Sequence, residues 1–201
     1  MNLSKCGNKI KNTTNAGGSS VESEVLSYEI FHCGFRATLR KEEMEVKYTD
    51  RTGSKSMIDY TCTCELLDLQ VGVSVTRATD AWETYDEERA TTHLTEKLNG
   101  LYIAQQNAEE KWDRNMLHVF AGSKIIAKKI KYAYKNLPKD VVSNAVVLIT
   151  VAESPVTLFD CHKEIQENTG NAEEVAKGKK QNNHRKRKRR KGRNRRRKVN
   201  K

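Results

Sequence analysis

Residues 56–78 read SMIDYTCTCELLDLQVGVSVTRA, and this stretch decides the fold. Residues 60–64 and 71–75 are rich in β-branched, aromatic and cysteine side chains, whereas the residues between them contain fewer strand formers and carry charges. The pattern predicts two paired strands with a tight connection. Alternate residues of a strand share a face, so Ser74 and Thr76 should lie together on the second strand, with Asp59 near the start of the first.

Apolar spacing predicts the elements on either side of this hairpin. Residues 23–31 favour a short helix with Ser23 as its cap, and residues 36–40 and 44–48 favour a strand or hairpin. After the central hairpin, apolar residues recur at steps of three and four between residues 86 and 113. That spacing predicts a long helix with one face against the sheet.

The following segment predicts strand, helix and strand. Residues 115–121 form a short apolar run, Ser123 is placed to cap a helix with an apolar stripe that extends to Leu137, and residues 145–152 form a continuous apolar run. A run of this kind is typical of a strand buried on both faces. Because strands joined through helices are usually parallel, we expect an α/β fold with a mixed central sheet flanked by helices on both faces.

Charge divides the chain sharply. Residues 177–201 hold 16 of the 37 Lys and Arg residues and no Asp or Glu, so residues 1–176 carry 21 basic and 26 acidic side chains. Together with the polar composition of both ends, this predicts a disordered leader at 1–20, an α/β domain at 21–165 and a disordered tail at 166–201 that is strongly basic from residue 177.

The tail carries a clear functional signal. Residues 184–198 hold 12 cations in 15 residues and no apolar or aromatic side chain, so they favour contact with phosphates rather than with bases. Such a run is also typical of a nuclear-import signal, and a charge run that only improves solubility is the alternative. The candidate nucleic-acid-binding residues are Arg185, Lys186, Arg187, Lys188, Arg189, Arg190, Lys191, Arg193, Arg195, Arg196, Arg197 and Lys198.

The cysteine and histidine residues indicate a reducing compartment and a buried core rather than a metal site. The chain has 5 cysteines, and it shows no apolar run that predicts a signal peptide or membrane anchor. Cys62 and Cys64 share a strand face, but their spacing from His32 and Cys33 matches no compact zinc site. His118 lies within an apolar run, where a hydrogen-bonded core histidine is the expected role.

This order of elements resembles the restriction-endonuclease-like nuclease superfamily, written PD-(D/E)XK, over residues 22–152. The resemblance implies a core of helix, three-stranded meander, helix and strand, with an acid early in the second strand and an acid-X-lysine triplet in the third. Asp59 stands where the first acid would be, and Ser74-Val75-Thr76 where the triplet would be. In such nucleases two carboxylates hold a divalent cation such as Mg²⁺, and a lysine positions the attacking water.

The triplet departs from the family pattern, because Ser74 and Thr76 are both neutral. The resemblance makes Asp59 the candidate metal ligand, and Asp59, Glu65, Ser74 and Thr76 the candidate catalytic residues. Glu24 is a second candidate for the missing acid. Gln70, Arg77 and Gln105 are candidates for contact with a phosphate. The alternative is that Asp59 is an ordinary strand-start residue and that the two hydroxyls are ordinary strand residues.

We therefore expect a nuclear or nucleolar protein with a nuclease-like but altered or inactive core and a tail that binds RNA or DNA. An active Mg²⁺-dependent endonuclease is one alternative. A non-catalytic module that binds a protein partner, with the tail as its nuclear address, is another. A local basic patch in the body, where Lys124, Lys128 and Lys131 fall on one helical face, either binds nucleic acid or is simply solvated.

Overall fold

The computed structural model describes residues 3–13, 21–49, 52–53, 55–80 and 84–152. The chain divides into two units, Met1–Phe159 and Asp160–Lys201, and every described residue belongs to the first. Among the described residues, none of the helices combines the length and the apolarity that a membrane crossing requires.

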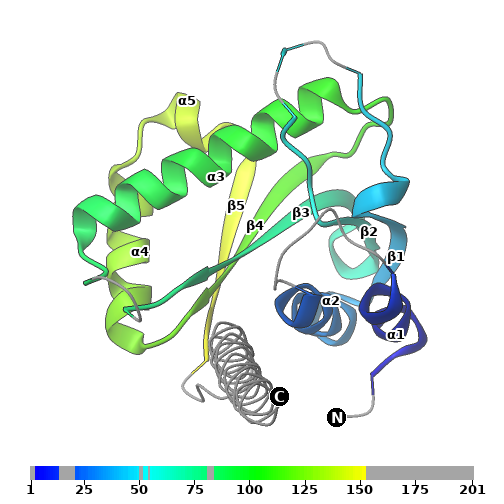
Figure 1. The fold of residues 1–201 in the computed structure, drawn as a ribbon, viewed down its shortest axis with the longest axis horizontal. Coiled ribbons are helices and arrows are strands. Elements are labelled where there is room, and N and C mark those ends of the chain that lie inside the picture. Colours follow the sequence, from blue (N-terminus) through cyan, green and yellow to red (C-terminus); the bar gives the residue numbers. More distant parts are fainter. Residues whose placement is uncertain (1–2, 14–20, 50–51, 54, 81–83, 153–201) are drawn as a thin grey trace, which may run out of the picture. The chain divides into compact units, whose positions relative to one another are not determined.

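The first unit is built on one five-stranded sheet whose strands lie in the order of the sequence (Figure 1). The first three strands form an antiparallel meander, and the third, fourth and fifth are parallel. This mixed sheet confirms the predicted α/β class and the predicted central hairpin. The strands are β1 (Ala37–Glu42), β2 (Tyr60–Cys64), β3 (Leu69–Ala78), β4 (Arg114–Ala121) and β5 (Ala145–Val151).

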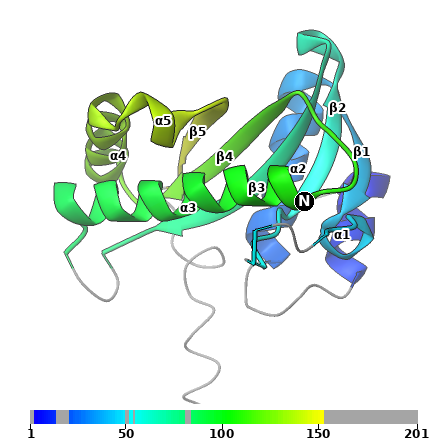
Figure 2. The same ribbon diagram turned by 90° about the horizontal axis from the view of Figure 1, so that it is seen from above.

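Helices cover both faces of the sheet, as predicted (Figure 2). One face packs against α1 and α2, and the other packs against α3 and α4, while the short α5 lies between α4 and β5 in the sequence. Two single-turn 3₁₀ helices follow β1 and β2 at Glu43–Glu45 and Glu65–Leu67. The α-helices are α1 (Lys5–Asn12), α2 (Val21–Phe35), α3 (Glu87–Asn107), α4 (Lys124–Asn136) and α5 (Lys139–Val142).

Strand β3 separates the two cores because its side chains alternate between them. Val71, Val73 and Val75 are buried in the core under α1 and α2. Gly72 lies on the opposite face, where an added Cβ would come within 2.5 Å of the Trp112 indole. The β3 backbone pairs with β2 on one side and with β4 on the other, so its register fixes the alternation in the middle of the sheet.

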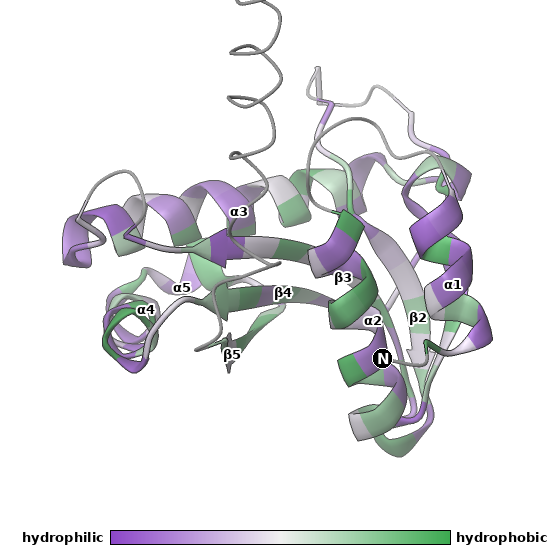
Figure 3. Cartoon of the chain, turned by 60° about the horizontal axis from the view of Figure 1, so that its bottom comes forward, coloured by the Kyte–Doolittle hydropathy of each residue, from purple (hydrophilic) through white to green (hydrophobic). Residues whose placement is uncertain are grey.

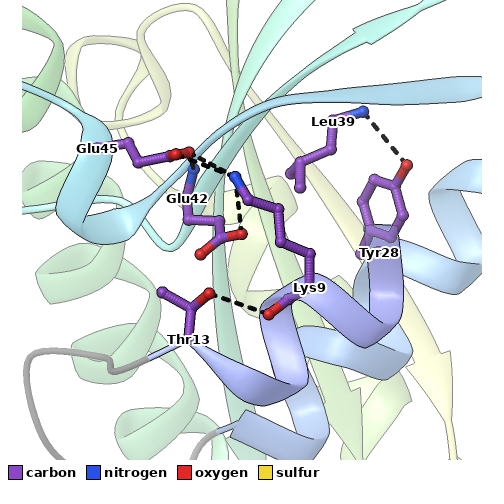
Figure 4. Close-up of polar contacts among 6 residues, drawn as sticks. All are labelled: Lys9, Thr13, Tyr28, Leu39, Glu42 and Glu45. Atoms are coloured by element: carbon purple, nitrogen blue, oxygen red, sulfur yellow. Dashed lines mark hydrogen bonds and ion pairs between the residues drawn. The ribbon is translucent and has the colours of Figure 1, made fainter. Parts of the chain in front are cut away.

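Part of the predicted disordered leader is a helix. α1 begins after Ser4, whose hydroxyl accepts a hydrogen bond from the Gly7 amide, and Ile10 is buried against α2. The Lys9 ammonium lies 3.0 Å from carboxylate oxygens of both Glu42 and Glu45, which attaches α1 to the end of β1 and to the turn after it (Figure 4). The prediction of disorder was wrong for these residues. It rested on their polar composition, whereas the residues that hold α1 in place lie far away in the sequence.

Three other predicted boundaries also differ from the structure. α2 begins before Ser23, which is buried inside the helix and is not its cap. Residues 44–48 form no strand, because the Glu45 carboxylate accepts the Glu42 amide and closes a 3₁₀ turn there. α3 ends at Asn107, and Trp112 packs on the core from the connection that follows.

Strand β5 was predicted to be buried on both faces, and this was wrong. It is the last strand of the sheet, so only β4 pairs with it among the described strands. Val146 remains 48% exposed and Val151 37% exposed. A continuous apolar run does not distinguish a central strand from an edge strand, because both positions can have one well-packed face.

Replacement of Gly72 by alanine tests the close contact between β3 and Trp112. We expect Gly72→Ala to lower the free energy of unfolding by about 1–3 kcal/mol, because the new methyl group forces the buried indole to move. Urea denaturation measures the change. The control is Gly34→Ala, at an exposed position of α2 where an added Cβ meets nothing within 4 Å, and it should raise stability by up to about 1 kcal/mol. A loss of similar size in both variants would contradict the packing argument.

Candidate functional site

Asp59 lies beside the part of β3 that carries Ser74 and Thr76, as the hairpin predicted. Its amide donates to the Val73 carbonyl oxygen at 2.9 Å, and its Oδ2 accepts the Val75 amide at 2.6 Å. The carboxylate is therefore held against the β3 backbone between the two hydroxyl residues. Ser74 and Thr76 are half-buried, so this group of side chains remains open to solvent in part.

The Asp59 carboxyl has a pKa raised to about 7. Burial is the largest cause, and repulsion from Glu24 adds to it, while the hydrogen bond from the Val75 amide acts in the opposite direction. Lys97 on α3 lowers the pKa only weakly. Burial and repulsion from nearby carboxylates together therefore outweigh the interactions that favour the ionised form of Asp59.

Thr76 belongs to a chain of hydrogen bonds that crosses from β3 to α3. Its Oγ1 lies 2.9 Å from Nε2 of His93, and Nδ1 of His93 lies 2.9 Å from the Tyr85 hydroxyl. The sequence analysis did not select His93 or Tyr85. His93 directly precedes Leu94 in the buried stripe of α3, so the helical period alone places it at the border of the sheet-facing side.

The side chains of His93 and Tyr85 in this series of hydrogen bonds are both neutral at neutral pH. Burial lowers the pKa of His93 to about 4, with Lys97 and Arg89 adding to the effect, and burial raises the pKa of Tyr85 to about 12. A neutral imidazole has one donor and one acceptor nitrogen, and Thr76 and Tyr85 engage both. A base with a pKa near 4 takes up protons poorly at neutral pH, so this Thr-His pair is better suited to positioning than to activating a hydroxyl.

The structure does not bring Glu65 to Asp59. Asp59 precedes β2 and Glu65 follows it, and an extended segment of this length spans about 20 Å. Gln70, at the start of β3, accepts a hydrogen bond from Arg40, also away from Asp59. Gln105 hydrogen-bonds with Asn115 and Asn144 near the end of α3, so it belongs to a separate amide network.

The residues around Asp59 do not fit a Mg²⁺ site. Mg²⁺ prefers oxygen ligands that include carboxylates, but Ser74 and Thr76 offer neutral hydroxyls. Glu24 and Glu43 raise the pKa of Asp59 through their charge. Even so, in the described ranges no three His, Cys, Asp or Glu side chains come together as a possible metal site.

His118, in contrast to the partly buried His93, is a core residue, as predicted. It is fully buried, its Nδ1 lies 2.7 Å from the Ser27 hydroxyl, and its Nε2 lies 2.8 Å from the Thr150 hydroxyl. Cys62 and Cys64 are also fully buried in the core under α1 and α2, with their sulfur atoms 3.9 Å apart. Both predictions of core positions are confirmed.

Comparison with known proteins shows that the chain is similar to a protein of a social amoeba. The chain is 33% identical over 165 residues to the AAC-rich mRNA clone AAC4 protein of Dictyostelium discoideum. The alignment covers 78% of this chain but 24% of that protein, so the chain spans about a quarter of the length of its curated relative. No protein-family model matches the chain. No solved structure matches it either.

The other candidate set, the cations between Arg185 and Lys198, lies outside the described residues. The candidate site of the described domain is therefore the group formed by Asp59, Ser74, Thr76, His93 and Tyr85. It combines one carboxyl of raised pKa with a neutral hydrogen-bonded chain.

Replacement of Asp59 by asparagine tests the raised pKa. In the unfolded chain an aspartate titrates near about 3.9, so between pH 4 and pH 7 the folded protein binds more protons and loses stability as the pH rises. Asp59→Asn should remove this loss. We expect the stability of the wild type to fall by on the order of 2 kcal/mol relative to Asp59→Asn between pH 5 and pH 8, less than the full shift implies because the group is partly solvated.

Urea denaturation at several pH values measures this difference. The control is Asp140→Asn, at an exposed position on α5, which should follow the wild type across the range. Parallel pH profiles for the wild type and Asp59→Asn would show that Asp59 is not the group whose pKa is raised.

Proposed function

We propose that this chain is a nuclear protein that associates with nucleic acid. Its folded domain is a nuclease-like core with an altered, inactive site, and its basic tail binds RNA or DNA and directs the protein to the nucleus. The proposal combines the order of elements from α2 to β4 with the chemistry around Asp59 and the composition of residues 177–201.

The main support for an inactive core is the hydrogen bond between the Thr76 hydroxyl and the His93 imidazole. In the superfamily that the sequence resembles, a lysine is expected there, and its ammonium supports a metal-bound water. Thr76 instead lies 2.9 Å from the imidazole of His93, which burial keeps neutral. The pKa of Asp59, raised to about 7, agrees with a site in which burial and repulsion from Glu24 outweigh the attraction of Lys97.

The tail supports the second half of the proposal. Its 12 cations in residues 184–198 have no acidic neighbour within residues 177–201, so their electrostatic attraction to a polyanion is not offset within that segment. A tail that engages six phosphates should lose about a thousandfold in affinity between 50 and 200 mM salt. This binding would show little base specificity, because the tail lacks side chains that stack on bases.

The test is an assay of cleavage and binding with the 201-residue chain. Labelled single- and double-stranded DNA and RNA are incubated with Mg²⁺ or Mn²⁺, beside Asp59→Ala and a variant with all eight arginines of residues 185–197 changed to glutamine. We expect no metal-dependent cleavage by any variant. Binding by the wild type and by Asp59→Ala should be strongly salt-dependent, and the arginine variant should lose most of it.

Other outcomes select the alternatives. Cleavage that Asp59→Ala abolishes would identify an active metal-dependent nuclease, which relies on a carboxylate besides Asp59. An absence of binding in the wild type, together with nuclear accumulation that the arginine variant loses in cells, would identify a protein-interaction module with a nuclear address.

A further inference from the structure

We propose that the exposed face of α4 is a second nucleic-acid-binding surface, which binds the phosphates of a single strand and stacks one base on Tyr132. The inference rests on the proposed function, since it takes nucleic acid as the partner, and it places part of the binding in the folded domain. The α4 face consists of Lys124, Lys128, Lys131, Tyr132 and Lys135.

The four lysines form one row along the helix. They occur at steps of four, three and four, which keeps them on one side, and they span about 16 Å of the helix axis. All four are exposed, whereas Ile126 and Ile130 are buried in the core under α3 and α4. Figure 3 shows α4 coloured by hydropathy, with hydrophilic and hydrophobic residues around the same helix.

The positions of the lysines on α4 lower the stability of the helix when the face contacts only water. The 13 residues of α4 include five lysines and no acidic residue, although acidic side chains outnumber basic ones over residues 1–176. Lys124 and Lys128, and Lys131 and Lys135, are like-charge pairs at four-residue spacing, which destabilise a helix. A cation at Lys124, in the first turn, also opposes the helix dipole. A bound polyanion would turn these repulsions into favourable contacts.

Tyr132 adds what the basic tail lacks. Its side chain is 56% exposed between Lys128 and Lys135 on the outer side of the helix. Exposed aromatic rings flanked by cations are typical of surfaces that bind single strands, because every base has a face that can stack. The tail has no aromatic residue in residues 177–201, so α4 is the better candidate for contact with bases.

The α4 face is held in place by contacts on the other side of the helix. The Lys129 ammonium donates to the Tyr85 carbonyl oxygen at 2.8 Å, and the Tyr134 hydroxyl donates to the Ala145 carbonyl oxygen at 3.2 Å. Ser123 caps the first turn by accepting the Ile126 amide. Lysines on a fixed helix lose less freedom on binding than lysines of a flexible chain.

The experiment compares two charge-matched variants of the 201-residue chain. One is Lys128→Gln/Lys131→Gln/Lys135→Gln, and the control is Lys5→Gln/Lys11→Gln/Lys47→Gln, in which three other exposed lysines are replaced. Fluorescence anisotropy with 20-nucleotide oligo(dT) and oligo(U), at about 50 to 300 mM salt, gives affinity and its salt dependence. We expect the α4 variant to lower the slope of log K against log salt by about 2, since each lost phosphate contact contributes roughly 0.7. The control should keep the wild-type slope.

Tyr132→Ala tests the stacking step separately. We expect about a tenfold loss of affinity for the single strand with an unchanged salt slope, because stacking releases no counterions. The matched control is Tyr102→Ala on α3, where the side chain is 47% exposed, and it should bind as the wild type does.

The variants separate failure of this inference from failure of the proposed function. Slopes that are equal for the wild type and the α4 variant would overturn the inference, and so would wild-type affinity in Tyr132→Ala. In those cases the proposed function still stands if the arginine variant of the tail has lost binding. An absence of binding in the wild type would overturn both.

Discussion

The double pairing of β3 is the constraint on which the rest of the domain depends. β3 pairs antiparallel with β2 over five positions and parallel with β4 over eight, and it is the longest strand of the sheet. A slip of one residue would turn Val71, Val73 and Val75 out of the core under α1 and α2. It would also turn Thr76 away from His93, so one register determines both the packing and the candidate site.

The close contact at Gly72 links this register to the placement of α3. Trp112 follows the helix and packs where a side chain on Gly72 would lie, and its indole nitrogen donates to the Asn115 side chain at 2.7 Å. At the other end of α3, Asp86 caps the helix by accepting the Arg89 amide. With both ends fixed, His93 lies over Thr76, so the neutral character of the site follows from how α3 is packed.

The sequence predicted the elements that show a regular spacing of apolar residues. It missed the elements that are held by contacts with residues distant in sequence. The hairpin, α3 and α4 have a clear period of two or of three to four residues, and the structure confirmed them. α1 is held by Glu42 and Glu45, more than thirty positions away, and no local period reports such contacts. The candidate site divided in the same way. The resemblance to the nuclease superfamily selected Asp59, Ser74 and Thr76, and strand alternation predicted that the two hydroxyls share a face, but the contact of His93 with Thr76 depends on how α3 packs on the sheet.

Charged residues at two places in the domain make it less stable than other residues at the same positions would. Asp59 holds a carboxyl where burial and Glu24 oppose its ionisation, and α4 carries lysines at spacings where like charges repel. Packing requires neither the Asp59 carboxyl nor the row of lysines. An asparagine at position 59 would avoid the cost of ionising a buried carboxyl, and a glutamate on the outer side of α4 would reduce the repulsion between the lysines. Residues that violate local rules without a structural gain are concentrated at functional sites. A buried carboxyl of raised pKa and like-charged lysines at four-residue spacing are therefore better explained by function than by folding.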